Sequence, residues 1–169
     1  TLPLLQEVLT LTDRPVVAAG GIATGRGMAA ALVAGAAGVW IGTPLLSCTE
    51  GLNAPSLRER VRAASGDETV LTRAFDVAEG ADWPERWPGR ALVNDFSREW
   101  HGREDELRET QDARRLVVEG RRTGDPAHAP VYAGESVGLV TTERSAADVV
   151  RQLDAEAEEA LRAVPKLLG

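Results

Sequence analysis

The sequence has 169 residues, of which 43% are hydrophobic and 27% charged, and its net charge is −7. No stretch approaches the roughly 20 apolar residues that span a bilayer, no signal-peptide pattern is present, and a pI near 4.9 disfavours a nucleic-acid-binding surface. The single cysteine, Cys48, cannot form an internal disulfide. We therefore expect a cytoplasmic protein with no nucleic-acid or membrane partner.

The first fifty residues predict alternating helices and strands. Apolar residues recur at helical spacing through residues 2–11. A short apolar run at 15–19 ends at two glycines and predicts a strand buried on both faces. Thr24 is placed to cap a helix that ends near Gly35. A second apolar run at 38–41 then predicts a parallel neighbouring strand.

The rest of the chain is less regular until its last helix, which Ser145 and Asp148 start with a capping-box pattern. The elements expected before it are, in chain order, a helical turn at 44–47, a helix at 55–64, an extended segment at 68–77, a loop at 80–88, helices at 91–107 and 111–120, a connector at 121–130 and an extended or irregular segment at 131–140.

This order predicts an α/β fold that is the C-terminal portion of a (β/α)8 TIM barrel. Two parallel strands cannot form a covered sheet, and such a barrel needs about 250 residues. The chain opens at Thr1 and reaches a strand within the first twenty residues, so we expect a fragment. We assign residues 1–50 to the last two βα units, 51–142 to an added helical or irregular segment, and 143–169 to a C-terminal helix that packs back on the barrel.

The strongest site signal is a pair of glycine turns, one after each predicted strand. The first contains Gly20 and Gly21, and the second contains Gly42 and Thr43. Glycine lets a backbone approach a ligand closely, and free amide groups at such turns bind phosphate. Thr43 is placed as the N-cap of a short helix with Pro44 at its first position. The spaced pair therefore predicts a phosphate site; taken singly, each glycine could simply end its strand.

The run from Pro15 to Thr43 resembles the nitronate monooxygenases, once called 2-nitropropane dioxygenases. Weaker similarity continues at residues 90–94, 133–134 and 137–140. The resemblance implies a TIM barrel with an added helical segment that binds FMN and oxidises alkyl nitronates with molecular oxygen. It implies FMN-phosphate contacts at Gly20, Gly21, Trp40, Ile41, Gly42 and Thr43.

Two departures from the family pattern affect this expectation. Trp40 stands where the family often has glutamine. The family's catalytic histidine and its flavin-ring residues lie on earlier strands, so we expect no catalytic residue and no metal ligand in this chain. The missing N-terminal part of the barrel would then be its necessary partner.

The remaining reactive residues have plain structural interpretations. We expect His101 and His128 at the surface and Cys48 as a packing residue. Trp83, Trp87 and Trp100 could line the mouth of a pocket, but we expect them to pack. The acidic residues at 104–106, and Glu156, Glu158 and Glu159 of the last helix, are expected to face solvent.

Three alternatives remain beside the nitronate oxidase. Enoyl-acyl-carrier-protein reductase II resembles the chain over the same turns and uses FMN with a nicotinamide cofactor, but no basic patch for an acidic carrier protein is evident. The second alternative is a non-catalytic fragment or one chain of a split protein. A Rossmann fingerprint at Gly25, Gly27 and Ala30 is the weakest, because five residues separate it from the preceding strand.

Overall fold

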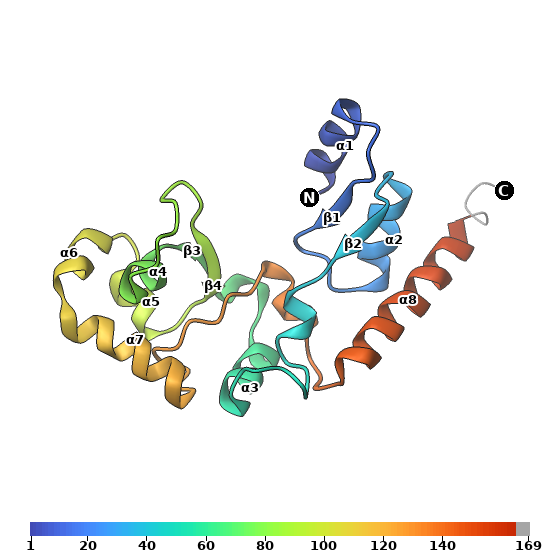
Figure 1. The fold of residues 1–169 in the computed structure, drawn as a ribbon. Coiled ribbons are helices and arrows are strands. Elements are labelled where there is room, and N and C mark those ends of the chain that lie inside the picture. The colour runs from blue at the N-terminus through green and yellow to red at the C-terminus, as the bar shows by residue number, and fades with distance from the viewer. Residues whose placement is uncertain (165–169) are drawn as a thin grey trace.

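The structure is a computed structural model that describes residues 1–164, and its N-terminal part shows the predicted alternation (Figure 1). Helix α1 (Leu2–Leu11) is followed by strand β1 (Val17–Ala19), helix α2 (Gly25–Val33) and strand β2 (Gly38–Trp40). The two strands pair in parallel, so α2 is the crossover between them. This part is the α/β arrangement expected from the sequence.

Local sequence signals set the ends of α2. The hydroxyl oxygen of Thr24 accepts a hydrogen bond from the Gly27 amide at 3.2 Å, as an N-cap does. At the other end Gly35 has a φ of +105°, a conformation that glycine adopts without steric cost. Both helix boundaries were predicted correctly.

The prediction that the first strand is buried on both faces is wrong for this chain. The core of this part collects Leu5 of α1, Ala18 of β1 and Ala31 of α2. It therefore lies on the sheet face to which Ala18 points. Val17, which points to the other face, is 52% exposed, because nothing in the described chain covers that side.

The middle of the chain contains an antiparallel sheet among short helices. Its elements are α3 (Pro55–Ala63), β3 (Thr69–Thr72), α4 (Ala74–Glu79), β4 (Gly89–Leu92), α5 (Asp95–Trp100), α6 (Glu104–Glu109) and α7 (Gln111–Thr123). Strand β3 pairs with β4, and Ala91 of β4 also bridges to Tyr132. The extended segment expected at 68–77 is therefore extended only over β3, and α4 takes most of the remainder.

The helix predicted at 91–107 is wrong. Its first residues belong to β4, where Leu92 donates a backbone hydrogen bond to Val131 at 2.8 Å. Asn94 then begins α5, because its side-chain oxygen accepts a hydrogen bond from the Ser97 amide at 2.9 Å. Gly102, with a φ of +80°, separates α5 from α6. A cap and a left-handed glycine thus divide a segment whose apolar spacing alone looked continuous.

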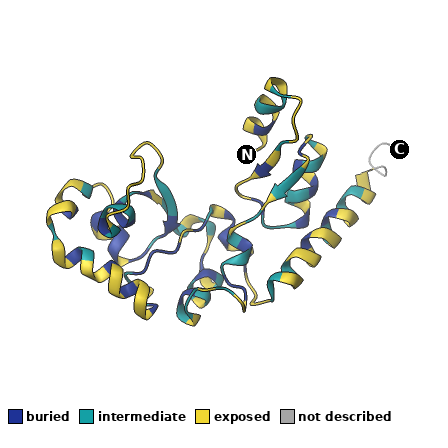
Figure 2. Cartoon of the chain, in the orientation of Figure 1, coloured by how far each residue is buried: buried dark blue, intermediate teal, exposed yellow. Residues whose placement is uncertain are grey.

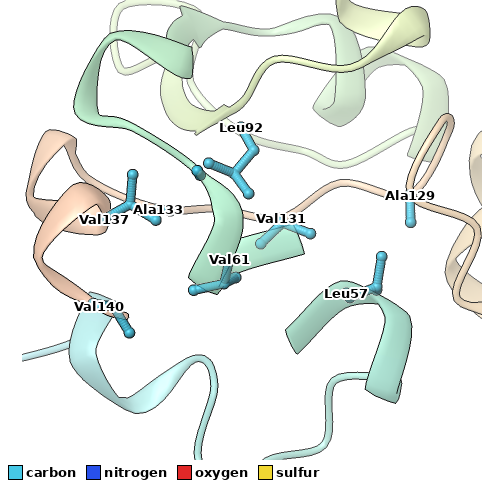
Figure 3. Packing of buried hydrophobic residues seen from close by; sticks show 9 residues of the cluster. Leu57, Val61, Leu92, Ala129, Val131, Ala133, Val137 and Val140 are labelled. Carbon is cyan, nitrogen blue, oxygen red and sulfur yellow. The ribbon is translucent and has the colours of Figure 1, made fainter. Parts of the chain in front are cut away.

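Two further hydrophobic cores hold the middle segment together. In one, Phe75 of α4 stacks on Phe96 of α5 with ring centroids 5.5 Å apart, and Trp100 is buried beside them. In the other, shown in Figure 3, α3 packs against β4 and the segment 129–140. The packing expected of Trp100 is confirmed, but Trp83 and Trp87 are 58% and 59% exposed, so that expectation is wrong for them.

The last helix, α8 (Ala146–Ala163), lies against α2 (Figure 1). Ser145 caps it as predicted, accepting a hydrogen bond from the Asp148 amide at 3.1 Å. Leu153 and Ala157 are buried, whereas one side of α8 is exposed along its length (Figure 2). The assigned range 143–169 also includes residues 165–169, which lie outside the described residues. No helix within residues 1–164 is long and apolar enough to cross a membrane.

Candidate functional site

The two glycine turns lie side by side at one edge of the parallel sheet. Ala19, the last residue of β1, is paired with Trp40, the last residue of β2. Gly20 and Gly42 follow these strand ends closely in the chain. Because the strands are parallel, their carboxyl ends meet at the same edge. The structure therefore brings together the turns that the sequence singled out.

The first turn requires glycine. Gly20 and Gly21 have φ values of +95° and +71°, which side-chain-bearing residues rarely adopt. The hydroxyl of Thr1 donates a hydrogen bond to the Gly20 carbonyl oxygen at 2.6 Å and so closes one side of the turn. A Cβ atom at Gly21 would meet nothing within 4 Å. The space in front of Gly21 is open.

The second turn is open as well, but its glycine does not have a positive φ. Gly42 has a φ of −125°, and a Cβ atom there would also meet nothing within 4 Å. The amides of Gly21 and Gly42 donate no hydrogen bond to any group within residues 1–164. Two amide donors without a partner among residues 1–164 therefore follow neighbouring strand ends, an arrangement that suits an anion.

Thr43 does not have the capping role that the sequence predicted. The N-cap of the short 3₁₀ helix Thr43–Leu45 is Gly42, which has no side chain to cap it. The Thr43 hydroxyl oxygen instead accepts a hydrogen bond from the Gly134 amide at 3.0 Å. The hydroxyl of Thr43 therefore links the second turn to the segment 131–140 and does not cap its own helix.

Gly134 is a site residue that sequence reasoning missed. A Cβ atom there would lie 3.4 Å from the Thr43 hydroxyl oxygen, so Gly134 lies directly against the second turn. The residue pair 133–134 was among those carrying the family resemblance, but no pattern in the sequence linked it to the second turn. The structure places it in contact with that turn.

Trp40 and Ile41 differ in exposure. Trp40 is 74% exposed and, by its register with Ala19, points to the open face of the sheet. Ile41 is half-buried and packs against the core beneath the turns. Of the two, only Trp40 offers a large side-chain surface beside the turns.

The N-terminus of α2 is already occupied by a carboxylate. The Gly25 amide donates a hydrogen bond to Oε2 of Glu156 at 3.0 Å, and this bond, followed by that from Gln152, lowers the pKa of the Glu156 carboxyl. The prediction that Glu156 faces solvent on the outer side of the last helix is therefore wrong. An anion at the glycine turns would be held by the turn amides and not by the end of α2.

The other reactive side chains do not belong to these turns. His101 is exposed, and His128 sits in a loop with Nδ1 2.6 Å from Oδ2 of Asp125. Cys48 is buried, and burial followed by the charge of Glu50 raises the pKa of its thiol. It is a packing residue, as predicted, because a thiol kept protonated is a poor nucleophile.

The acidic run at 104–106 makes surface ion pairs, with Arg103 Nη2 2.6 Å from Glu106 Oε2. Within residues 1–164 no group of three or more His, Cys, Asp or Glu side chains is arranged to hold a metal ion.

Comparison with known proteins identifies the family to which this chain is similar. The nitronate monooxygenase family model matches residues 1–156. Nitronate monooxygenase npaC of Metarhizium robertsii is 37% identical over 96% of this chain and 46% of its own length.

Two solved structures are similar in fold. Nitroalkane oxidase from Streptomyces ansochromogenes has a TM-score of 0.78 at 32% identity and is matched over 96% of this chain and 45% of its own. FabK from Thermotoga maritima has a TM-score of 0.81 at 29% identity, and the match covers 99% of this chain and 51% of FabK. The chain thus spans about half the length of the proteins it matches. By its sequence and its α/β fold, the chain belongs to the nitronate monooxygenase family.

Proposed function

We propose that this chain forms the FMN-phosphate-binding part of an FMN-dependent nitronate monooxygenase. The observation that carries the proposal is the pair of open glycine turns at adjacent ends of two parallel strands. The phosphate contacts we propose are Gly20, Gly21, Trp40, Ile41, Gly42 and Thr43, as the family resemblance implies, with Gly134 in support.

The residues present suit a phosphate group. The amides of Gly21 and Gly42 would donate to phosphate oxygens, and neither glycine carries a side chain that would fill the space. Thr43 and Gly134 hold the second turn in place through their 3.0 Å hydrogen bond. The exposed indole of Trp40 would wall the site on the open face of the sheet. When bound, FMN would supply the electron-accepting chemistry of the reaction.

The rest of the reaction would depend on residues outside this chain. We assign residues 1–50 to the last two βα units of a TIM barrel, residues 51–142 to its added segment, and residues 143–169 to a helix packing back on the barrel. The flavin-ring pocket, the catalytic base and the site for alkyl nitronate and oxygen would then belong to the N-terminal part of the barrel. This chain alone would be inactive.

A second candidate is an FMN-dependent enoyl-acyl-carrier-protein reductase. The chain is as similar in fold to FabK as to nitroalkane oxidase, so the fold alone does not choose between a reductase and an oxidase. The curated relatives named nitronate monooxygenase favour the oxidase. A barrel fragment without activity is the remaining alternative.

The visible spectrum of the protein expressed from its whole gene tests the proposal. We expect bound flavin whose spectrum changes when a nitronate is added without oxygen. If the flavin spectrum does not change with nitronate but the flavin is reduced by NADH, the reductase is favoured. A protein that retains no flavin would contradict both candidates.

Replacing Gly21 with alanine tests the phosphate site directly. The substitution strains a φ of +71° and puts a methyl group into the open space, so we expect FMN to bind about tenfold more weakly or worse. Affinity for riboflavin, which has no phosphate, should change much less. Gly38→Ala is the matched control, since a Cβ there also meets nothing within 4 Å but lies at the start of β2, at the opposite end of the strand from the turns. Equal FMN affinity in both variants would refute this site.

A further inference from the structure

A cavity of about 700 Å³ lies beside the loop between α4 and β4. This loop is on the opposite side of the molecule from α2 and α8 (Figure 1). Three aromatic side chains line the cavity, Trp83, Trp87 and Tyr132, together with the carboxylates of Asp76 and Glu79. We call this group of five residues the aromatic cleft. None of its residues belongs to the glycine turns.

Two of the three aromatic rings, those of Tyr132 and Trp83, make specific contacts. Tyr132 packs directly on the backbone of β4, since a Cβ atom at Gly89 would lie 2.7 Å from its ring. Its other neighbour is Phe75, edge-on with ring centroids 6.4 Å apart. The indole N–H of Trp83 donates a hydrogen bond to the Trp87 carbonyl oxygen. The cleft is therefore a formed surface, and its indoles are nonetheless more than half exposed.

One carboxylate in the cleft is not neutralised. Oδ1 of Asp76 accepts a hydrogen bond from the Tyr132 hydroxyl at 2.7 Å, but its Oδ2 is buried and has no hydrogen-bond partner within residues 1–164. Glu79 differs, because Nε of Arg121 lies 2.6 Å from its Oε1. The negative charge of this carboxylate is therefore not matched by an ion pair among the described residues, and it acts on a cation in the cleft through space and not through direct contact with Oδ2.

The cleft already attracts one cation. The guanidinium carbon of Arg86 lies 5.4 Å from the centroid of the Trp87 ring, within the range of a cation–π contact. Trp83 and Tyr132 present further ring surface without such a partner among the described residues. Aromatic faces around an unneutralised carboxylate are the chemistry that recognises alkyl-substituted ammonium ions.

We propose that the aromatic cleft binds a small organic ammonium ion. The cation lies against the rings of Trp83 and Tyr132 and opposite the carboxylate of Asp76. A nitronate is an anion and is repelled by the same carboxylate, so this site is separate from the chemistry proposed for the flavin. The cleft adds a cation-binding function to this part of the chain.

Choline and its uncharged isostere 3,3-dimethyl-1-butanol test the charge requirement. Binding of each to the protein expressed from its whole gene is measured by saturation-transfer NMR on the methyl protons. We expect choline to bind at least about tenfold more tightly than the alcohol. Equal binding of the two would mean a merely apolar groove, and no binding of choline would mean no site; either result overturns the proposal.

Variants then locate the site. Asp76→Asn keeps an oxygen that accepts from Tyr132 but removes the charge, and Trp83→Leu removes an exposed ring from the surface. Each should weaken choline binding about tenfold, with circular dichroism confirming that the variants fold. Asp105→Asn, a carboxylate on α6 outside the cleft, should leave binding unchanged. Unchanged choline affinity in both cleft variants would overturn the proposal.

Discussion

Replacing Gly25 with alanine should push the last helix away from α2. Gly25 is the first residue of α2. A Cβ atom there would lie 2.2 Å from Cβ of Glu156 and 2.5 Å from the backbone nitrogen of Ala157. Because one of these atoms belongs to the backbone, no side-chain rotation relieves the overlap. The helix α8 has to shift, or α2 has to lose its first turn.

The expected loss of stability combines three contributions. Overpacking of this kind costs about 1–3 kcal/mol. The 3.0 Å hydrogen bond from the Gly25 amide to Glu156 is lengthened or lost, which adds about 1 kcal/mol for a carboxylate that is partly exposed. Alanine in a helix is more favourable than glycine by up to about 1 kcal/mol, which offsets part of this loss. We expect a net destabilisation of about 1–4 kcal/mol.

Gly27→Ala is the matched control, because it lies in the same helical turn but has room for a side chain. The nearest atom to a Cβ there is Oγ1 of Thr24 at 3.6 Å, an ordinary contact, so this variant should be stabilised by up to about 1 kcal/mol. Urea unfolding followed by circular dichroism measures both variants. If Gly25→Ala proves as stable as Gly27→Ala, α8 does not pack on α2 as described.

Three further predictions concern single contacts. Thr43→Val removes the acceptor for the Gly134 amide and should cost about 1–2 kcal/mol in urea unfolding, whereas Thr43→Ser should cost much less; equal losses would contradict the role of the hydroxyl. The α2 amide lowers the pKa of Glu156 from 4.5, so the stability it contributes is present above that value and is lost as pH falls through the lower folded value. Glu156→Gln should therefore flatten the acid side of a Tm-against-pH curve, and an unchanged slope would refute this. Leu107→Ala opens a fully buried site and should cost about 2–5 kcal/mol, while the fully exposed Leu52 tolerates the same change; similar Tm values for the two variants would contradict the packing.

Features that depend on neighbouring residues could be predicted from the sequence. Thr24 and Ser145 cap their helices through amides three residues ahead, and the short apolar runs before Gly20 and Gly42 form the parallel strands. Interactions of this range depend on only a few consecutive residues. The α/β alternation and the position of the two glycine turns follow from them.

Contacts between distant segments could not be predicted in this way. Gly134 meets Thr43 across 91 positions of the chain, and Glu156 meets Gly25 across 131. Neither residue has a local pattern that indicates its partner. The same holds for β4, which pairs with β3 although its apolar spacing resembled part of a helix.

The sequence by itself determined the elements of the first fifty residues and the start of the last helix, because caps, turns and hydrophobic periods act over a few residues. The tertiary structure alone decided which exposed groups share a site. It completed the second turn with Gly134, turned Glu156 inward, and left the indoles of Trp83 and Trp87 at the surface. The physical reason is that burial and hydrogen bonding between segments depend on how whole elements pack, and that packing overrides the preference of any single stretch.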